Sequence, residues 1–125
     1  MKKELLTGKW KFNRHITDNM IKADRIANGQ LVITETSWNE KGEMDGQPFF
    51  QQYKIDMQDN FTVLFNDDRV FYSLADITAK QTIEHLCGND LYQGIWELTE
   101  DKLNLQWIVK GKTKDYIMKT QYIKS

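Results

Sequence analysis

Apolar and polar side chains alternate most clearly in LNLQWIVK (residues 103–110), which places Leu103, Leu105, Trp107 and Val109 on one face. A period of two is typical of a β-strand with one buried face and one solvent face. No 12-residue window has helical spacing, so the sequence predicts an all-β protein of about nine to ten strands. The same alternation recurs through most of the chain, in runs marked by Trp10, Phe12 and Ile16; Leu31 and Ile33; Phe49, Tyr53, Ile55 and Met57; Phe61, Val63 and Phe65; Val70, Tyr72 and Leu74; and Tyr116, Met118 and Tyr122.

Turn-forming residues separate these runs at intervals near ten residues. Asn28-Gly29 lies between two candidate strands and predicts a tight hairpin turn. Residues 75–82 have the weakest pattern and are predicted as a loop or a helical turn. The other predicted turns are at Lys41-Gly42, Asp45-Gly46, Asp59-Asn60, residues 66–68, Gly88-Asn89 and Glu100-Asp101.

This pattern predicts one domain over residues 1–125, a single antiparallel β-barrel. A meander of hairpins can close on itself and so remove its exposed edges. Eight or more strands leave an interior that side chains fill or that holds one small ligand. A two-sheet sandwich has the same periodicity and remains an alternative.

Composition limits the classes of partner. The chain of 125 residues has 17 basic and 18 acidic residues, a net charge of −1 and one cysteine. Nucleic-acid binders usually carry a basic surplus, so no nucleic-acid partner is expected. No apolar run has the length of a signal peptide core or of a membrane helix, so we expect a cytoplasmic protein without a membrane partner.

Two stretches resemble known families. Gly8-Lys9-Trp10 resembles the opening strand of the calycin superfamily, which includes lipocalins and fatty-acid-binding proteins. HLCGNDLYQG (residues 85–94) and WIVKGKTKDY (residues 107–116) resemble a bacterial family of lipocalin-like barrels to which no activity is assigned. Further matches to that family are Trp10, Arg14, Glu35, Phe65, Asp67, Arg69 and Phe71, while Ile33, Tyr72 and Lys112 replace its usual tyrosine, histidine and proline. The resemblance implies a calycin-like barrel.

Arg14 shares a strand face with Trp10 and Phe12, so a guanidinium is expected inside the barrel. A buried charge is costly unless it is paired. Glu35 follows Leu31 and Ile33 in the same alternation and is the predicted partner, with Asp90 as the second candidate.

These residues give a predicted ligand site with a mixed apolar and polar interior. An internal hydrogen-bond network that fixes strand register would explain the same residues without a ligand. Lys114 is expected at the rim, where it would attract an anionic or polar group. The predicted ligand-binding residues are Arg14, Glu35, Tyr53, His85, Asp90, Tyr92, Trp107 and Lys114.

Three functions remain open from the sequence. The leading hypothesis is binding of a small amphipathic or anionic molecule, with no cofactor, by a monomer or homodimer. A second is acid–base catalysis, with Glu35 or His85 as the acid or base and Arg14 as the anion holder. A third is a protein-interaction or dimer module that uses exposed aromatic side chains such as Trp38. No metal site is expected, because His15 is the only other histidine besides His85 and a zinc site needs three or four ligands.

Overall fold

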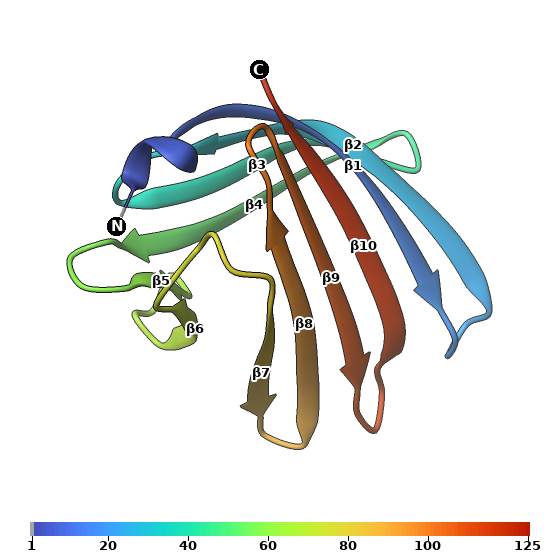
Figure 1. Ribbon diagram of the computed structural model, residues 1–125. Coiled ribbons are helices and arrows are strands. Elements are labelled where there is room, and N and C mark those ends of the chain that lie inside the picture. The colour runs from blue at the N-terminus through green and yellow to red at the C-terminus, as the bar shows by residue number, and fades with distance from the viewer. Residues whose placement is uncertain (1) are drawn as a thin grey trace.

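The computed structural model describes residues 2–125, and its strands form one antiparallel sheet that curls into a nearly closed barrel (Figure 1). A short 3₁₀ helix, η1 (Lys3–Leu5), precedes the sheet. None of the described helices is long and apolar enough to span a membrane. The ten strands are β1 (Gly8–Asp18), β2 (Ala23–Ile33), β3 (Ser37–Met44), β4 (Gln47–Asp56), β5 (Phe61–Leu64), β6 (Val70–Leu74), β7 (Gln81–Cys87), β8 (Asp90–Leu98), β9 (Lys102–Lys110) and β10 (Asp115–Lys124). The all-β prediction and the strand count are therefore confirmed.

The strand order is β6-β5-β4-β3-β2-β1-β10-β9-β8-β7. Every neighbouring pair except one is a hairpin, and the exception is the pairing of β1 with β10 along Trp10 to Asp18. This pairing joins the two halves of the meander into one sheet, which excludes the two-sheet sandwich. Strands β6 and β7 are the two ends of the sheet, and no ladder joins them within the described residues.

Alternation along the strands sorts the side chains as predicted. In β9, Leu103, Leu105, Trp107 and Val109 are all buried, and the residues between them are half-buried. Trp10 and Phe12 of β1 are also buried. Phe65 was predicted inside, but it lies just beyond β5 and is only half-buried.

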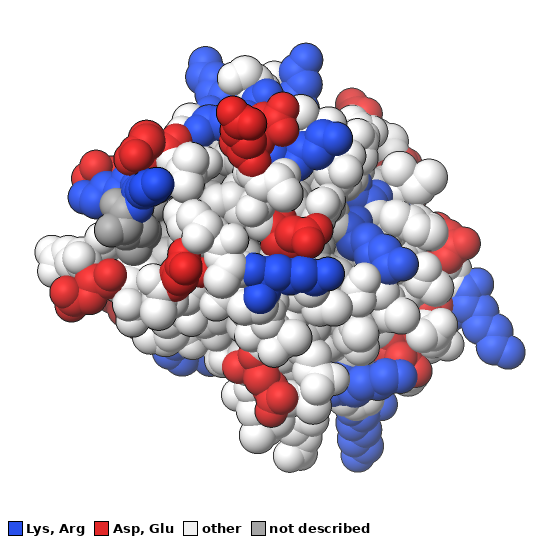
Figure 2. Space-filling view, viewed as in Figure 1, with Lys and Arg blue, Asp and Glu red and all other residues white. Residues whose placement is uncertain are grey.

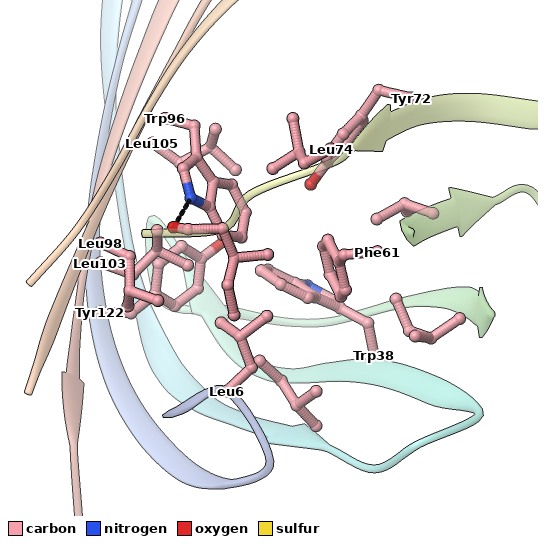
Figure 3. Close-up of a cluster of buried hydrophobic side chains, with 14 of the residues drawn as sticks. Leu6, Trp38, Phe61, Tyr72, Leu74, Trp96, Leu98, Leu103, Leu105 and Tyr122 are labelled. Carbon is pink, nitrogen blue, oxygen red and sulfur yellow. Dashed lines mark hydrogen bonds between the residues drawn. The ribbon is translucent and has the colours of Figure 1, made fainter. Parts of the chain in front are cut away.

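A dense apolar core fills one end of the barrel (Figure 3). Two tryptophans tie irregular segments to it. Trp10 Nε1 donates to the Leu6 carbonyl oxygen at 2.9 Å, and Trp96 Nε1 donates to the Ile77 carbonyl oxygen at 2.9 Å. Both indole N–H groups are thereby satisfied in an apolar setting. Residues 75–80 are a loop that covers this end, as the weak pattern suggested.

Two predicted turns are wrong. Asn28-Gly29 lies in the middle of β2, and Lys41-Gly42 lies in the middle of β3. Gly29 and Gly42 face each other across the β2–β3 ladder. A Cβ on Gly29 would lie 2.2 Å from the Lys41 carbonyl oxygen, and a Cβ on Gly42 would lie 2.0 Å from that of Asn28. These glycines therefore permit a close approach of two backbones, not a reversal of the chain.

Candidate functional site

A cavity of about 240 Å³ lies inside the barrel, beside the core-filled end. It is partly open to the surface, and the exposed residue Gln51 forms part of its lining. Its walls combine aliphatic and aromatic side chains with a few polar ones, the composition typical of small-molecule sites. The lining residues are Arg14, Ile16, Trp38, Glu40, Met44, Phe49, Gln51, Tyr53, Val63, Phe71, Tyr72, Leu105, Trp107, Tyr116, Met118 and Tyr122.

Arg14 lies inside the barrel, where the pleat of β1 places it two residues after Phe12. Its side chain is 7% exposed. Arg14 Nε donates to Thr120 Oγ1 at 2.8 Å, and Thr120 is the residue of β10 that pairs with Arg14 of β1. Nη2 donates to Glu40 Oε2 at 2.8 Å and to the Tyr122 hydroxyl at 2.9 Å. The Phe12 ring lies 4.8 Å from the guanidinium carbon and adds a cation–π contact.

Glu40 of β3 is the acidic partner of Arg14, so the predicted pairing with Glu35 is wrong. The Glu40 side chain is 3% exposed, and its Oε2 also accepts from the Tyr122 hydroxyl at 2.5 Å and from Trp38 Nε1 at 3.2 Å. Glu35 lies outside the barrel in the loop between β2 and β3, exposed and 3.6 Å from Lys3 Nζ. The alternation of β2 ends at Ile33, so it does not predict which residues face inward after the loop.

Part of this ion pair stays available to a ligand. Arg14 Nη1 and Glu40 Oε1 have no hydrogen-bond partner among the described residues. Asn39 Oδ1 is the one fully buried side-chain polar atom of residues 2–125 that lacks a partner. The two free atoms of Arg14 and Glu40 are therefore not sealed in the protein, and both residues line the cavity. The hydroxyls of Tyr53 and Tyr72 also have no hydrogen-bond partner among the described residues, and they too are not fully buried.

The tyrosines of the cavity stay neutral. Burial raises the pKa of Tyr53 to about 12, and the negative charge of Glu40 adds to the shift. Burial likewise raises the pKa of Tyr72 and of Tyr122. Burial lowers the pKa of Arg14, but its interactions with Tyr122 and Glu40, which include hydrogen bonds to both, outweigh burial and the pKa is raised overall. The cavity therefore holds one positive and one negative charge among neutral hydroxyls.

A β-bulge forms the aromatic wall. The β5–β6 register shifts at Val63/Leu64, so that Phe71 and Tyr72 are both buried although they are consecutive. Phe71 stacks on Trp107 of β9 with ring centroids 4.9 Å apart and an interplanar angle of 16°. On its other side, Phe71 stacks on Phe65 at 4.8 Å. Through Phe71 and Trp107, β6 at one end of the sheet packs against β9 in the other half of the sheet.

Lys114, Asp90 and Tyr92 form a cluster at the rim. Lys114 Nζ donates to the Tyr92 hydroxyl at 2.9 Å and lies 3.2 Å from Asp90 Oδ2. The hydrogen bond to Tyr92, and after it the one to Asp90, raises the pKa of Lys114. Asp90 is therefore the partner of Lys114 and not of Arg14, which corrects the second predicted pairing. Because this lysine is already paired, it is a weaker attractor of anions than the sequence suggested.

The structure brings three of the eight predicted residues, Arg14, Tyr53 and Trp107, into the cavity wall. His85 is half-buried near the rim, with its ring centroid 5.3 Å from that of Phe71. Sequence reasoning missed Glu40, Tyr72 and Tyr122 as site residues. It also expected an exposed Trp38, which is wrong, because that side chain is buried and donates to Glu40. The alternation Trp38-x-Glu40 was the signal that could have identified the partner of Arg14.

The comparison with one solved structure agrees with the barrel. An S-type phycobiliprotein lyase, CPES, from Guillardia theta superposes with a TM-score of 0.66 at 14% identity, covering 98% of this chain and 89% of that one. At this identity the likeness shows the fold alone. A REP1-NXSQ fatty acid transporter (TM-score 0.39, 16% identity, 96% of each chain covered) is also similar. So is fatty-acid-binding protein 1 of Echinococcus granulosus (TM-score 0.37, 10% identity, 97% and 98% covered).

No curated protein sequence matches the chain. A family model matches residues 6–124, from the residue after η1 to the end of β10. The match covers the whole barrel, including both halves of the cavity wall. The chain therefore belongs to DUF6314, a family of unknown function.

Proposed function

We propose that the protein binds a small amphipathic molecule in the barrel cavity. The observation that carries this proposal is the cavity of about 240 Å³, whose lining combines a buried ion pair with apolar side chains. Because Arg14 Nη1 and Glu40 Oε1 are not sealed in the protein, water or the polar group of a ligand can bind them at the cavity.

The size of the cavity limits the ligand. Pockets for drug-sized ligands measure about 300–1,000 Å³. A cavity of about 240 Å³ suits a compact molecule or one end of a longer one. The aromatic side chains in the lining, among them Phe71 and Trp107, favour a ligand with an apolar part.

The surface supports a site inside the barrel. Lys, Arg, Asp and Glu are interspersed over the face shown in Figure 2, without a large area of one sign. This face offers no electrostatic platform for a polyanion. The buried charges of Arg14 and Glu40 are therefore the best candidates for specific recognition.

Native mass spectrometry of freshly purified protein tests the proposal. We expect a co-purified mass that is lost on denaturation. Replacing Met118, which lines the cavity, with Trp should fill the space and abolish that mass. The matched control is Met20→Trp, because Met20 is exposed and lies outside the cavity. A wild-type protein that carries no extra mass and binds neither naphthalene-2-carboxamide nor naphthalene-2-carboxylate, two small amphipathic probes, would contradict the proposal.

A further inference from the structure

We propose that the ligand carries a neutral group with a hydrogen-bond donor beside an acceptor, such as an amide or a lactam, which binds the free edge of the Arg14–Glu40 pair. This inference rests on the proposed function and names the chemical class that the site selects. The acceptor of the ligand would accept a hydrogen bond from Arg14 Nη1, and the donor of the ligand would donate one to Glu40 Oε1.

The first argument is the charge of the cavity. Arg14 and Glu40 are the two charged residues among those that line it, and their atoms lie 2.8 Å apart. A carboxylate drawn to Arg14 would come within a few ångströms of the Glu40 carboxylate. Attraction and repulsion of similar size then nearly cancel, while the anion still loses its hydration. An ammonium group meets the same cancellation with the signs reversed.

The second argument is the inventory of free atoms. Arg14 Nη1 can only donate, and Glu40 Oε1 can only accept. Arg14 already uses Nε and Nη2, so it cannot offer a carboxylate the two-pronged grip on which arginine recognition of anions depends. One donor nitrogen, Nη1 with its two N–H groups, and one acceptor oxygen, Oε1, remain, and an amide presents a complementary acceptor and donor in one plane.

The third argument is the rest of the polar wall. The hydroxyls of Tyr53 and Tyr72 line the same cavity and have no partner among residues 2–125. A neutral phenol can donate or accept, so these groups adapt to either side of an amide. Neither adds a charge that would favour an anion over a neutral group.

The test compares two probes that differ only in the head group, naphthalene-2-carboxamide and naphthalene-2-carboxylate. Two-dimensional ¹H–¹⁵N NMR titrations at pH 7.5 give both dissociation constants and show whether the shifts map to the cavity. We expect the amide to bind wild-type protein at least tenfold more tightly than the carboxylate. A carboxylate that binds equally well or better overturns this inference and leaves the proposed function standing.

Glu40→Gln removes the negative charge while keeping a group of similar shape. Carboxylate affinity should then rise at least tenfold, because Arg14 is no longer neutralised, and amide affinity should change less. Glu35→Gln is the matched control, since Glu35 is exposed outside the barrel, and both affinities should stay within twofold of wild type. An unchanged preference in folded Glu40→Gln overturns the inference, and the wild-type comparison decides alone if that variant fails to fold.

The remaining outcomes separate this inference from the proposed function. If neither probe binds and no mass co-purifies, the proposed function fails and this inference fails with it. If neither probe binds but a molecule co-purifies, the chemical structure of that molecule decides whether this inference holds. A neutral amide-like group supports the inference, and a free carboxylate, phosphate or amine overturns it.

Discussion

Replacing Arg14 with Met should destabilise the protein by about 3 kcal/mol. Breaking a buried ion pair by removing one partner typically costs about 3–5 kcal/mol, because the other charge is left buried. The lower end applies here, since Glu40 keeps hydrogen bonds from Tyr122 and Trp38. For a chain of this size, such a loss corresponds to a fall in Tm of roughly 10 °C.

A double-mutant cycle tests the coupling. Glu40→Leu alone should cost a similar amount, because it strands the Arg14 charge. The double variant, Arg14→Met with Glu40→Leu, should lose only about 1–2 kcal/mol, mainly because the buried Tyr122 hydroxyl loses both partners. Urea unfolding followed by circular dichroism gives the free energies. A single-variant loss below about 1 kcal/mol, or losses that simply add in the double variant, would refute this reasoning.

Three further predictions concern the frame around the site. Because burial raises the pKa of Tyr53 to about 12, against about 10 in the unfolded chain, its contribution to stability is complete below pH 10. It should be lost between pH 10 and 12, by roughly 2–3 kcal/mol, and the loss should be smaller in Tyr53→Phe when urea unfolding is compared at each pH. Gly29→Ala should cost more than about 2 kcal/mol in urea unfolding, because its Cβ would meet backbone atoms. Gly88→Ala, where the space is open and only the positive φ is unfavourable, should cost about 1 kcal/mol, and equal losses would contradict the clash. Trp96→Phe should lower the free energy of unfolding by about 1–3 kcal/mol by leaving the Ile77 carbonyl oxygen without its donor, and an unchanged Tm would count against that role.

The strands were predictable because each buries one face, and a period of two records this in the residues themselves. The inward position of Arg14 followed from the same period. Two glycine signals misled, since a glycine looks the same in sequence whether it serves a turn or, like Gly29 and Gly42, a close backbone approach. Only the partner strand distinguishes the two cases.

The partner of Arg14 was missed for a similar reason. The alternation of β2 was extended past Ile33 to Glu35, but the chain leaves the sheet there and re-enters at Ser37. The register of β3 then decides which acid faces inward, and that register depends on pairing with β2 and β4. The bulge that turns both Phe71 and Tyr72 inward depends equally on pairing with β5. Periodicity can place Trp38 and Glu40 on one face of β3, but it shows neither which strands β3 pairs with nor where a bulge lies.

The single non-hairpin ladder has a consequence for how the barrel forms. Eight of the nine strand pairings within residues 2–125 join neighbours in sequence, and among them only β1 with β10 must bring together residues about a hundred positions apart. Closing so long a loop costs conformational entropy, and non-local contacts slow folding. A circular permutant that links the two ends and opens the chain in the loop at residues 75–80 would make every pairing local. It should fold faster than the natural order while keeping the same sheet.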